Sequence, residues 1–107
     1  MTLKFRVENG KIQVLEFVIE GGVLDPTHLS SIQVPSVNPS KPIIVSGRGP
    51  LWLYAFLAHE LHFVRILATF EPRIGKGIIV EAPSNSLLGQ GISPESGEIT
   101  PITLGAK

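Results

Sequence analysis

The sequence predicts a small α/β domain built on a mixed β-sheet. Alternating apolar and charged residues near the N-terminus indicate a half-buried β-hairpin. The β-branched run Ile43-Ile44-Val45 indicates a buried strand, and a densely apolar helix over residues 50–63 separates it from another buried strand over residues 64–70. A strand–helix–strand unit implies a parallel crossover, so the sheet must combine antiparallel and parallel pairs.

Length and composition indicate one folded domain of 107 residues. Hydrophobic residues make up 43% and charged residues 17% of the chain, which excludes a disordered protein. Nine Lys and Arg balance nine Asp and Glu, and this zero formal charge argues against non-specific binding of double-stranded DNA, which phosphate neutralisation drives. Cysteine is absent, so disulfides, thiolate zinc sites and cysteine nucleophiles are excluded.

No stretch of the sequence predicts membrane insertion. The N-terminal segment MTLKFRVENG lacks the apolar core of a signal peptide. The longest strongly apolar run, residues 51–58, is far shorter than the roughly 20 residues that span a bilayer. We therefore expect a soluble cytoplasmic protein.

The N-terminal elements follow from turn and capping residues. Asn9-Gly10 favours a two-residue hairpin turn, with residues 12–19 as the returning strand. Asp25 is placed to cap a short helix that ends near Ile32. Residues 34–42 contain prolines at three positions and predict an irregular connector.

The C-terminal half predicts a second hairpin and a tail. Lys76-Gly77 turns the chain from the strand of residues 64–70 into a short strand over residues 78–81. From Ala82 onward Gly, Pro and Ser dominate. We expect an extended C-terminal tail over residues 83–107, or a loose edge strand over residues 98–104 that binds its own or a neighbouring domain.

The predicted long helix has apolar residues around nearly all of its circumference. One face of a sheet cannot bury such a helix, so either the C-terminal part of the chain or another subunit must cover its outer side. We favour a homodimer.

The loop Ser46-Gly47-Arg48-Gly49 between the buried strand and this helix is a candidate anion site. Its glycines let the backbone bend tightly and approach a ligand. The free N–H groups and positive dipole end of the helix would lie beside Arg48, which suits a phosphate or carboxylate. Strand–glycine loop–helix turns are common, so a purely structural turn is the alternative.

The segment His59-Glu60-Leu61-His62 is not a zincin motif, because that motif needs histidines four residues apart on one helical face. We expect His59 to be satisfied within the packing. His62 lies near the end of the predicted helix, at the opposite end of the crossover unit from the glycine loop.

Glu71 and Arg73 follow a buried strand, where α/β sheets commonly place functional side chains. A surface ion pair of little energetic value is the alternative. A histidine and a carboxylate such as His62 and Glu71 could hold a hard divalent ion, Mn²⁺ or Mg²⁺, with waters completing its coordination.

The combination of SGRGPLWLYAFLAHELH, the following FEPRIG and the preceding IQVPSV resembles the small ring-nuclease family of type III CRISPR systems known as Csx-three or Crn-three. The resemblance covers residues 3–80. It implies a Rossmann-like (CARF-like) fold and a homodimer that forms higher assemblies around its ligand. It also implies a Mn²⁺-dependent phosphodiesterase that cuts cyclic tetra-adenylate into short linear adenylates and so ends type III signalling.

By position, the resemblance implies a ligand-binding loop at residues 46–49 and an active-site histidine at His62. Arg73 matches the arginine beside an acidic residue, and Glu71 stands where aspartate is expected. One subunit's loop would bind the ring while another subunit's His62–Glu71 edge brings the metal to the phosphate, with the RNA 2′-OH as nucleophile. The alternatives are a Mn²⁺-dependent exonuclease on adenylate-rich RNA 3′ ends, a sensor that binds without cutting, and a structural module without a nucleotide ligand.

Overall fold

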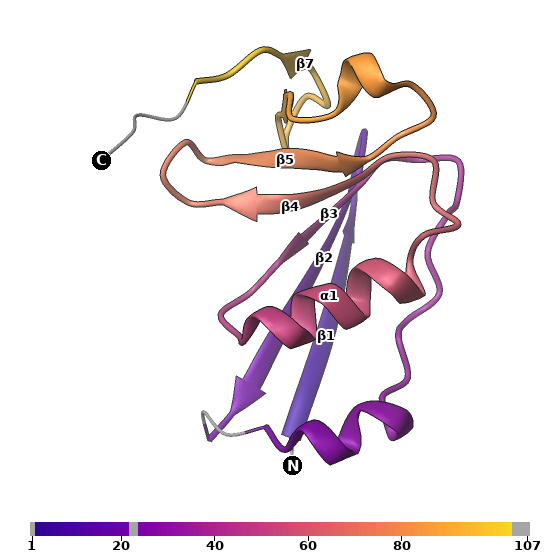
Figure 1. The fold of residues 1–107 in the computed structure, drawn as a ribbon, viewed down its shortest axis with the longest axis vertical. Coiled ribbons are helices and arrows are strands. Elements are labelled where there is room, and N and C mark those ends of the chain that lie inside the picture. The colour runs from indigo at the N-terminus through magenta and orange to yellow at the C-terminus, as the bar shows by residue number, and fades with distance from the viewer. Residues whose placement is uncertain (1, 22–23, 104–107) are drawn as a thin grey trace.

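A computed structural model describes residues 2–21 and 24–103. Their strands form one seven-stranded sheet (Figure 1). The elements follow in the order β1 (Thr2–Asn9), β2 (Gln13–Glu20), the 3₁₀ helix η1 (Pro26–Ser31), β3 (Ile43–Ser46), α1 (Leu51–Glu60), β4 (Leu67–Glu71), β5 (Lys76–Glu81), the 3₁₀ helix η2 (Asn85–Leu87), β6 (Gly91–Ile92) and β7 (Ile99–Thr100). None of the described helices is long and apolar enough to cross a membrane.

The strands lie in the sheet in their order along the chain. β2, β3 and β4 are parallel, and all other neighbours are antiparallel. The predicted mixed sheet and the parallel crossover through α1 are therefore confirmed. A doubly wound sheet reverses its strand order and carries helices on both faces. The strand order of this sheet runs from β1 to β7 without a reversal. The structure therefore does not confirm the Rossmann-like part of the fold class, which stays a prediction.

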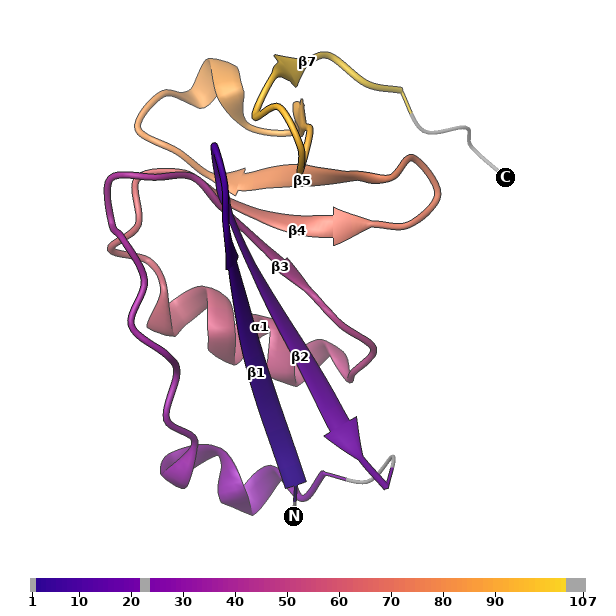
Figure 2. The same cartoon turned by 180° about the vertical axis from the view of Figure 1, so that it is seen from behind.

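Two hydrophobic cores lie on opposite faces of the sheet, and Figure 2 shows the face away from α1. In β3, Ile43 and Val45 belong to the core beneath α1, whereas Ile44 belongs to the other core. Because successive strand residues point to opposite faces, a strand that is buried on both sides must be apolar throughout. The β-branched run has this pattern for that reason.

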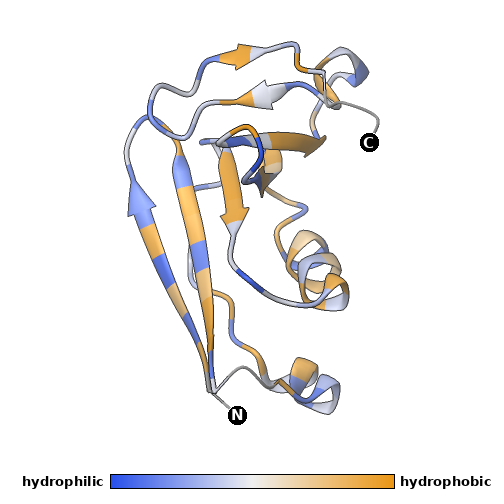
Figure 3. Cartoon of the chain, turned by 90° about the vertical axis from the view of Figure 1, so that its left-hand side faces the viewer, coloured by the Kyte–Doolittle hydropathy of each residue, from blue (hydrophilic) through white to orange (hydrophobic). Residues whose placement is uncertain are grey.

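The N-terminal hairpin is present, and hydropathy alternates along its strands (Figure 3). Its turn differs from the prediction: Asn9 pairs with Gln13, so residues 10–12 form the loop instead of Asn9-Gly10. The cause is the buried Gln13, which is 1% exposed. Its amide donates to the carbonyl of Asn38 at 2.8 Å and accepts from the N–H of Asn38 at 2.7 Å. This anchoring fixes the first residue of β2.

The short helix and the irregular connector are confirmed. Asp25 accepts a hydrogen bond from the N–H of Thr27 at 2.9 Å and so caps η1. α1 begins after Pro50, which is its N-cap, and ends at Glu60 instead of near residue 63. Hydrophobic residues of η1 and the connector pack on the same core as α1, namely Leu29, Ile32, Val34 and Val37. These residues, and not the C-terminal segment, pack against the core on the α1 side of the sheet. The homodimer stays a prediction.

The C-terminal half is more ordered than the sequence predicted. β4 and β5 form the expected hairpin, although β4 begins at Leu67. The predicted turn at Lys76-Gly77 is wrong: the chain turns at residues 72–75, and Lys76 and Gly77 are the first residues of β5. The expected tail over residues 83–107 instead adds η2, β6 and β7, and it closes the second core with the fully buried Ile92. β7 falls inside the edge strand predicted for residues 98–104, of which residue 104 lies outside the described residues. The sequence did not predict these two-residue strands, because the apolar residues of this Gly- and Pro-rich stretch are too widely spaced to form a recognisable strand pattern.

Candidate functional site

A pocket of about 540 Å³ opens where β3 and β4 end. The carboxyl ends of neighbouring parallel strands meet at one edge of a sheet, which is where open α/β sheets bind ligands. The volume lies within the range of small-molecule sites, roughly 300–1,000 Å³. Apolar, hydroxyl and cationic side chains share its wall, which consists of Ser46, Gly47, Arg48, Leu51, Tyr54, Thr69, Phe70 and Pro72.

The glycine loop at this pocket is shaped by its contact with Phe17. Gly47 has φ +154°, and a Cβ there would lie 2.6 Å from the carbonyl oxygen of Phe17. A Cβ at Gly49 would lie 2.7 Å from Cε1 of the Phe17 ring. Close approach of a ligand to these glycines stays a prediction. The structure shows that packing against Phe17 also requires them, and this packing fixes the loop at the pocket rim.

Tyr54 joins the loop to the core. Its ring packs edge-on against Phe17, with centroids 5.2 Å apart and planes at 71°. Its hydroxyl donates a hydrogen bond to the carbonyl of Gly47 at 2.5 Å. Burial raises the pKa of Tyr54 above its usual value, so the hydroxyl remains a donor at neutral pH. The sequence alone did not single out Tyr54 as a site residue.

Thr69 and Phe70 were also missed, although a signal for them existed. The predicted parallel crossover already implied that the last residues of the second strand lie beside the glycine loop. In the structure Thr69 pairs with Val45, directly before Ser46. The strand's carboxyl end therefore contributes to the same pocket as residues 46–48.

Arg48 supplies positive charge at the pocket rim. The residue is exposed, and the ion pairs of the described residues do not include it. The helix behind it has no side-chain cap, and its first intrahelical bonds run from Leu53 and Tyr54 to Pro50. The N–H groups of Leu51 and Trp52 precede these bonds and are thus left without an intrahelical partner. The predicted combination of arginine, loop and helix N-terminus is present at the pocket.

Glu71 and Arg73 form a two-pronged ion pair at the same edge. Nε of Arg73 lies 2.9 Å from Oε2 of Glu71, and Nη2 lies 2.9 Å from Oε1. The backbone N–H of Arg73 also donates to Oε2 at 3.2 Å. These bonds from Arg73 lower the pKa of Glu71 to about 2. Both carboxylate oxygens are therefore engaged, and the guanidinium is held in a fixed plane.

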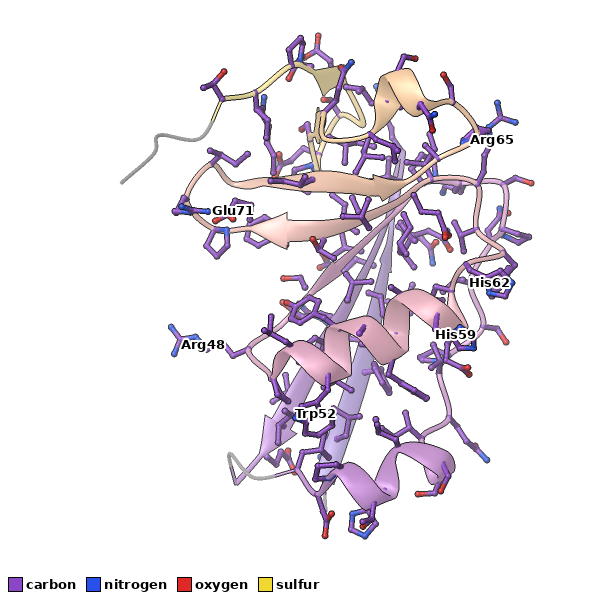
Figure 4. The ribbon with its side chains drawn as sticks, in the orientation of Figure 1. Arg48, Trp52, His59, His62, Arg65 and Glu71 are labelled. Atoms are coloured by element: carbon purple, nitrogen blue, oxygen red, sulfur yellow. The ribbon has the colours of Figure 1, made fainter. Side chains whose placement is uncertain are left out.

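His62 lies at the far end of the molecule from Glu71, and Figure 4 shows Arg48 and Glu71 on one side and His59 and His62 on the other. The hypothesis of a shared His62–Glu71 edge is wrong for a single chain. The physical reason is the crossover itself: the end of α1 leads back to the start of β4, whereas Glu71 ends that strand.

A divalent metal does not fit the side chains that one chain brings together. The described residues contain no cluster of three or more His, Asp or Glu side chains that could hold an ion. Glu71, the candidate carboxylate, already gives both of its oxygens to Arg73. Any Mn²⁺ or Mg²⁺ site that uses both His62 and Glu71 needs residues from two subunits.

The two histidines at the end of α1 are exposed, so the prediction that His59 is satisfied within the packing is wrong. Their rings stack with centroids 5.9 Å apart at 25°. Nδ1 of His62 lies 2.7 Å from the carbonyl oxygen of His59. A carbonyl only accepts, so this bond places a proton on Nδ1 and leaves Nε2 of neutral His62 as an acceptor.

Comparison with known proteins decides the family. The family model described as CRISPR-associated protein (Cas_csx3) matches residues 17–93, from within β2 through β6. The chain belongs to the Csx3 family. An uncharacterized protein of Aquifex aeolicus (strain VF5) is 34% identical over 80 residues, covering 71% of each chain. The resemblance seen in the sequence is confirmed, and the matched Csx3 region contains the pocket loop, His62, Glu71 and Arg73.

Proposed function

We propose that this Csx3-family protein binds cyclic tetra-adenylate at the pocket where β3 and β4 end and cleaves it to short linear adenylates. The observation that carries the proposal is the pocket wall itself. Arg48 can pair with phosphate oxygens, while Phe70 and Leu51 offer apolar surface to a base. Family membership supports a role in CRISPR defence, and we propose type III signalling as the pathway that this cleavage switches off.

A cyclic tetranucleotide is a compact polyanion with rotational symmetry. A symmetric oligomer can therefore offer it repeated copies of one small cationic site. A formal net charge of zero is compatible with this, because each subunit supplies only its local arginines. The proposal thus includes a homo-oligomer around the ligand and, because the substrate is an intracellular signal, a cytoplasmic protein.

In this proposal one subunit binds the phosphate and another subunit supplies the histidine that accepts the proton. Arg48 and Arg73 hold phosphate oxygens, and Glu71 keeps the Arg73 guanidinium in the plane that suits a phosphate. His62 of another subunit accepts the proton of the ribose 2′-OH as its oxygen attacks the adjacent phosphorus. The bond to the 5′ oxygen of the next nucleotide breaks, that oxygen takes up a proton, and a 2′,3′-cyclic phosphate remains.

Mn²⁺ dependence remains a separate part of the proposal. Because one chain does not assemble ligands for the ion, no step above depends on it. His62 and Glu71 of different subunits are the candidate ligands, with Mg²⁺ as the alternative ion; if they hold it, they do so in place of the base role of His62 and of the contact between Glu71 and Arg73. The assay must therefore include both ions.

Cleavage is tested by incubating the purified full chain with cyclic tetra-adenylate and either Mn²⁺, Mg²⁺ or EDTA, and resolving the products by chromatography. We expect linear adenylates from the native protein and loss of product for His62→Ala. His59→Ala is the matched control, because the carbonyl that accepts from His62 is backbone and stays. Equal loss in both variants would contradict the role of His62.

The same experiment separates the alternatives. Tight binding without products would leave a sensor that sequesters the ring. Shortening of an adenylate-tailed RNA, with the ring untouched, would favour the exonuclease. Absence of binding to either nucleotide would favour a structural module.

A further inference from the structure

β2 runs past the end of β3 and leaves part of one edge open. The parallel pairing of the two strands stops at Glu16 and Ser46, whereas β2 continues to Glu20 (Figure 1). From β3 the chain enters the glycine loop and then α1, so among the described residues no strand lies beside residues 17–20 on this side. The last four residues of β2 therefore pair only with β1.

The open backbone groups can be assigned from the hydrogen bonds of β2. The N–H of Gln13 donates to the carbonyl of Pro42, which leads into β3, so odd-numbered residues of β2 face β3. Of the odd-numbered residues beyond the paired part, Phe17 is 1% exposed, and its carbonyl is covered by the backbone of Gly47, where a Cβ would lie 2.6 Å from the oxygen. Ile19 is half-buried. No turn, loop or side-chain hydrogen bond of the described residues reaches its N–H or its carbonyl.

A pocket of about 380 Å³, which we call the β2-edge pocket, opens at this place. Its lining consists of Glu16, Phe17, Val18, Ile19, Gly47 and Arg48. The larger pocket of about 540 Å³ shares Gly47 and Arg48 with it, and its other walls come from β3, α1 and the end of β4. Because β3 lies between β2 and β4 in the sheet, the two pockets flank the loop that follows β3. Arg48 stands between them, and Figure 4 shows it extending outward from the loop.

The polar groups of the β2-edge pocket match an adenine base. A residue in an extended strand presents its N–H and its carbonyl side by side to the same neighbour. Adenine presents the complementary pair on its Watson–Crick edge, where N1 accepts and the 6-amino group donates. Hypoxanthine and guanine carry a donor at N1 and an acceptor at position 6, so they would set like groups against the backbone of Ile19 and leave both unpaired.

The remaining lining suits the flat face of a base joined to a phosphate. Val18 is 53% exposed and offers apolar side-chain surface. Glu16 also lines the pocket, but its carboxylate lies 2.6 Å from Nη2 of Arg6, so its charge is balanced within the chain. The charge of Arg48 is available to an anion, because the ion pairs of the described residues do not include it.

We propose that the β2-edge pocket binds the adenine of a nucleotide whose phosphate lies at Arg48, and that the backbone of Ile19 selects adenine by bonding to its N1 and its 6-amino group. Resting on the proposed function, this places two neighbouring bases of the cyclic adenylate in the two pockets, on either side of one phosphodiester. Selection then depends on the main chain, at the point where β2 outlasts β3.

The test titrates the full chain with AMP, and with IMP, in which the donor and the acceptor that face Ile19 are exchanged. We expect AMP to bind at least about tenfold more tightly, as for the loss of a two-point contact to a base. Hydrogen exchange followed by NMR gives a second readout. Saturating AMP should slow exchange of the Ile19 amide at least about tenfold, whereas the amide of Val18, which faces β1, should not change.

Two variants separate the backbone of Ile19 from its side chain. Ile19→Pro removes an N–H that the sheet does not use, so the pairing with β1 should remain, and the preference for AMP over IMP should be lost. Ile19→Val is the matched control, because it keeps both backbone groups and should bind AMP as the native protein does. Circular dichroism verifies that each variant folds.

Equal affinities of the native protein for AMP and IMP overturn the inference, and so does an Ile19 amide that AMP does not slow. Both results come from the native chain, so they decide the matter even where Ile19→Pro fails to fold. Cleavage of cyclic tetra-adenylate is measured separately. Selective AMP binding without cleavage would support this site and contradict the proposed function, whereas cleavage without a preference for AMP would overturn this site alone.

Discussion

The two ends of α1 are built in opposite ways. At its N-terminus, the glycine loop is pressed against Phe17 and bonded to Tyr54, so the pocket rim belongs to the folded core. At its C-terminus, His62 is exposed, and a bond to the carbonyl of His59 and stacking on the ring of His59 orient it. The binding half of the proposed site is therefore coupled to stability, whereas the histidine half can change without affecting the fold.

This difference separates two kinds of experiment. Changes at the loop should alter stability and ligand binding together, because the same contacts serve both. Changes at His62 should alter only what happens when another subunit meets the pocket.

Gly47→Ala should have the largest effect. A Cβ would lie 2.6 Å from the Phe17 carbonyl, and the φ of +154° is unfavourable for alanine. We expect the free energy of unfolding to fall by about 3 kcal/mol and ligand binding to be lost. Urea unfolding measures it, with Gly10→Ala as control, since the nearest atom to a Cβ at Gly10 is 3.8 Å away. Equal stabilities would show that the loop can move away from Phe17.

His62→Ala should reduce cleavage by at least about 100-fold, the lower range for a proton-transfer residue. Its unfolding free energy should change by less than about 0.5 kcal/mol, because the side chain is exposed. Single-turnover rates and thermal melting measure the two quantities in parallel. A loss of stability as large as that of Gly47→Ala would remove the contrast between the two ends.

The sequence predicted the architecture well where patterns are local and continuous. The hairpin alternation, the buried β3 run and the glycine loop before α1 all carry their structure in adjacent residues. The strands β6 and β7 were missed because each has two residues, too few for a period. The hairpin turn was misplaced because Gln13 is fixed by a connector 25 residues away, which no local pattern records.

The site was predicted in its parts and misjudged in its grouping. Residues 46–49, His62, Glu71 and Arg73 were all singled out, and the ion pair was a stated alternative. Glu71 was grouped with His62 because a histidine and a carboxylate can hold a divalent ion and because the resemblance implies an active-site histidine at His62 and an acidic residue at Glu71. The predicted parallel crossover should have grouped it with Ser46, since both end parallel strands. The prediction for His59 was wrong for another reason: Leu57 and Leu61 are the buried positions at this end of α1, so His59 lies on the exposed face of the helix.

Arg48→Ala should weaken binding of cyclic tetra-adenylate by about tenfold, since a hydrogen bond to a charged group contributes about 1.5 kcal/mol or more. Stability should not change, because the described residues offer this exposed side chain no ion pair. Calorimetric titration measures it, and Lys11→Ala, an exposed cation in the hairpin loop, is the control. Equal affinities for both variants would place the ligand elsewhere.

The smallest effect concerns acid stability at the Glu71–Arg73 pair. A carboxyl whose folded pKa is lowered stabilises the protein above its unfolded pKa, and that contribution is lost as the pH falls toward the folded value. Glu71 has an ordinary value of 4.5 and a folded value of about 2, so the window lies between these two pH values. The pair is at the surface, so the loss should be slight.

Glu71→Gln should flatten the pH dependence of unfolding in this window, while Glu98→Gln, at an exposed carboxyl, should not. Identical pH profiles for native protein and Glu71→Gln would mean that Arg73 is free to leave Glu71, and the carboxylate would then be open to a metal ion.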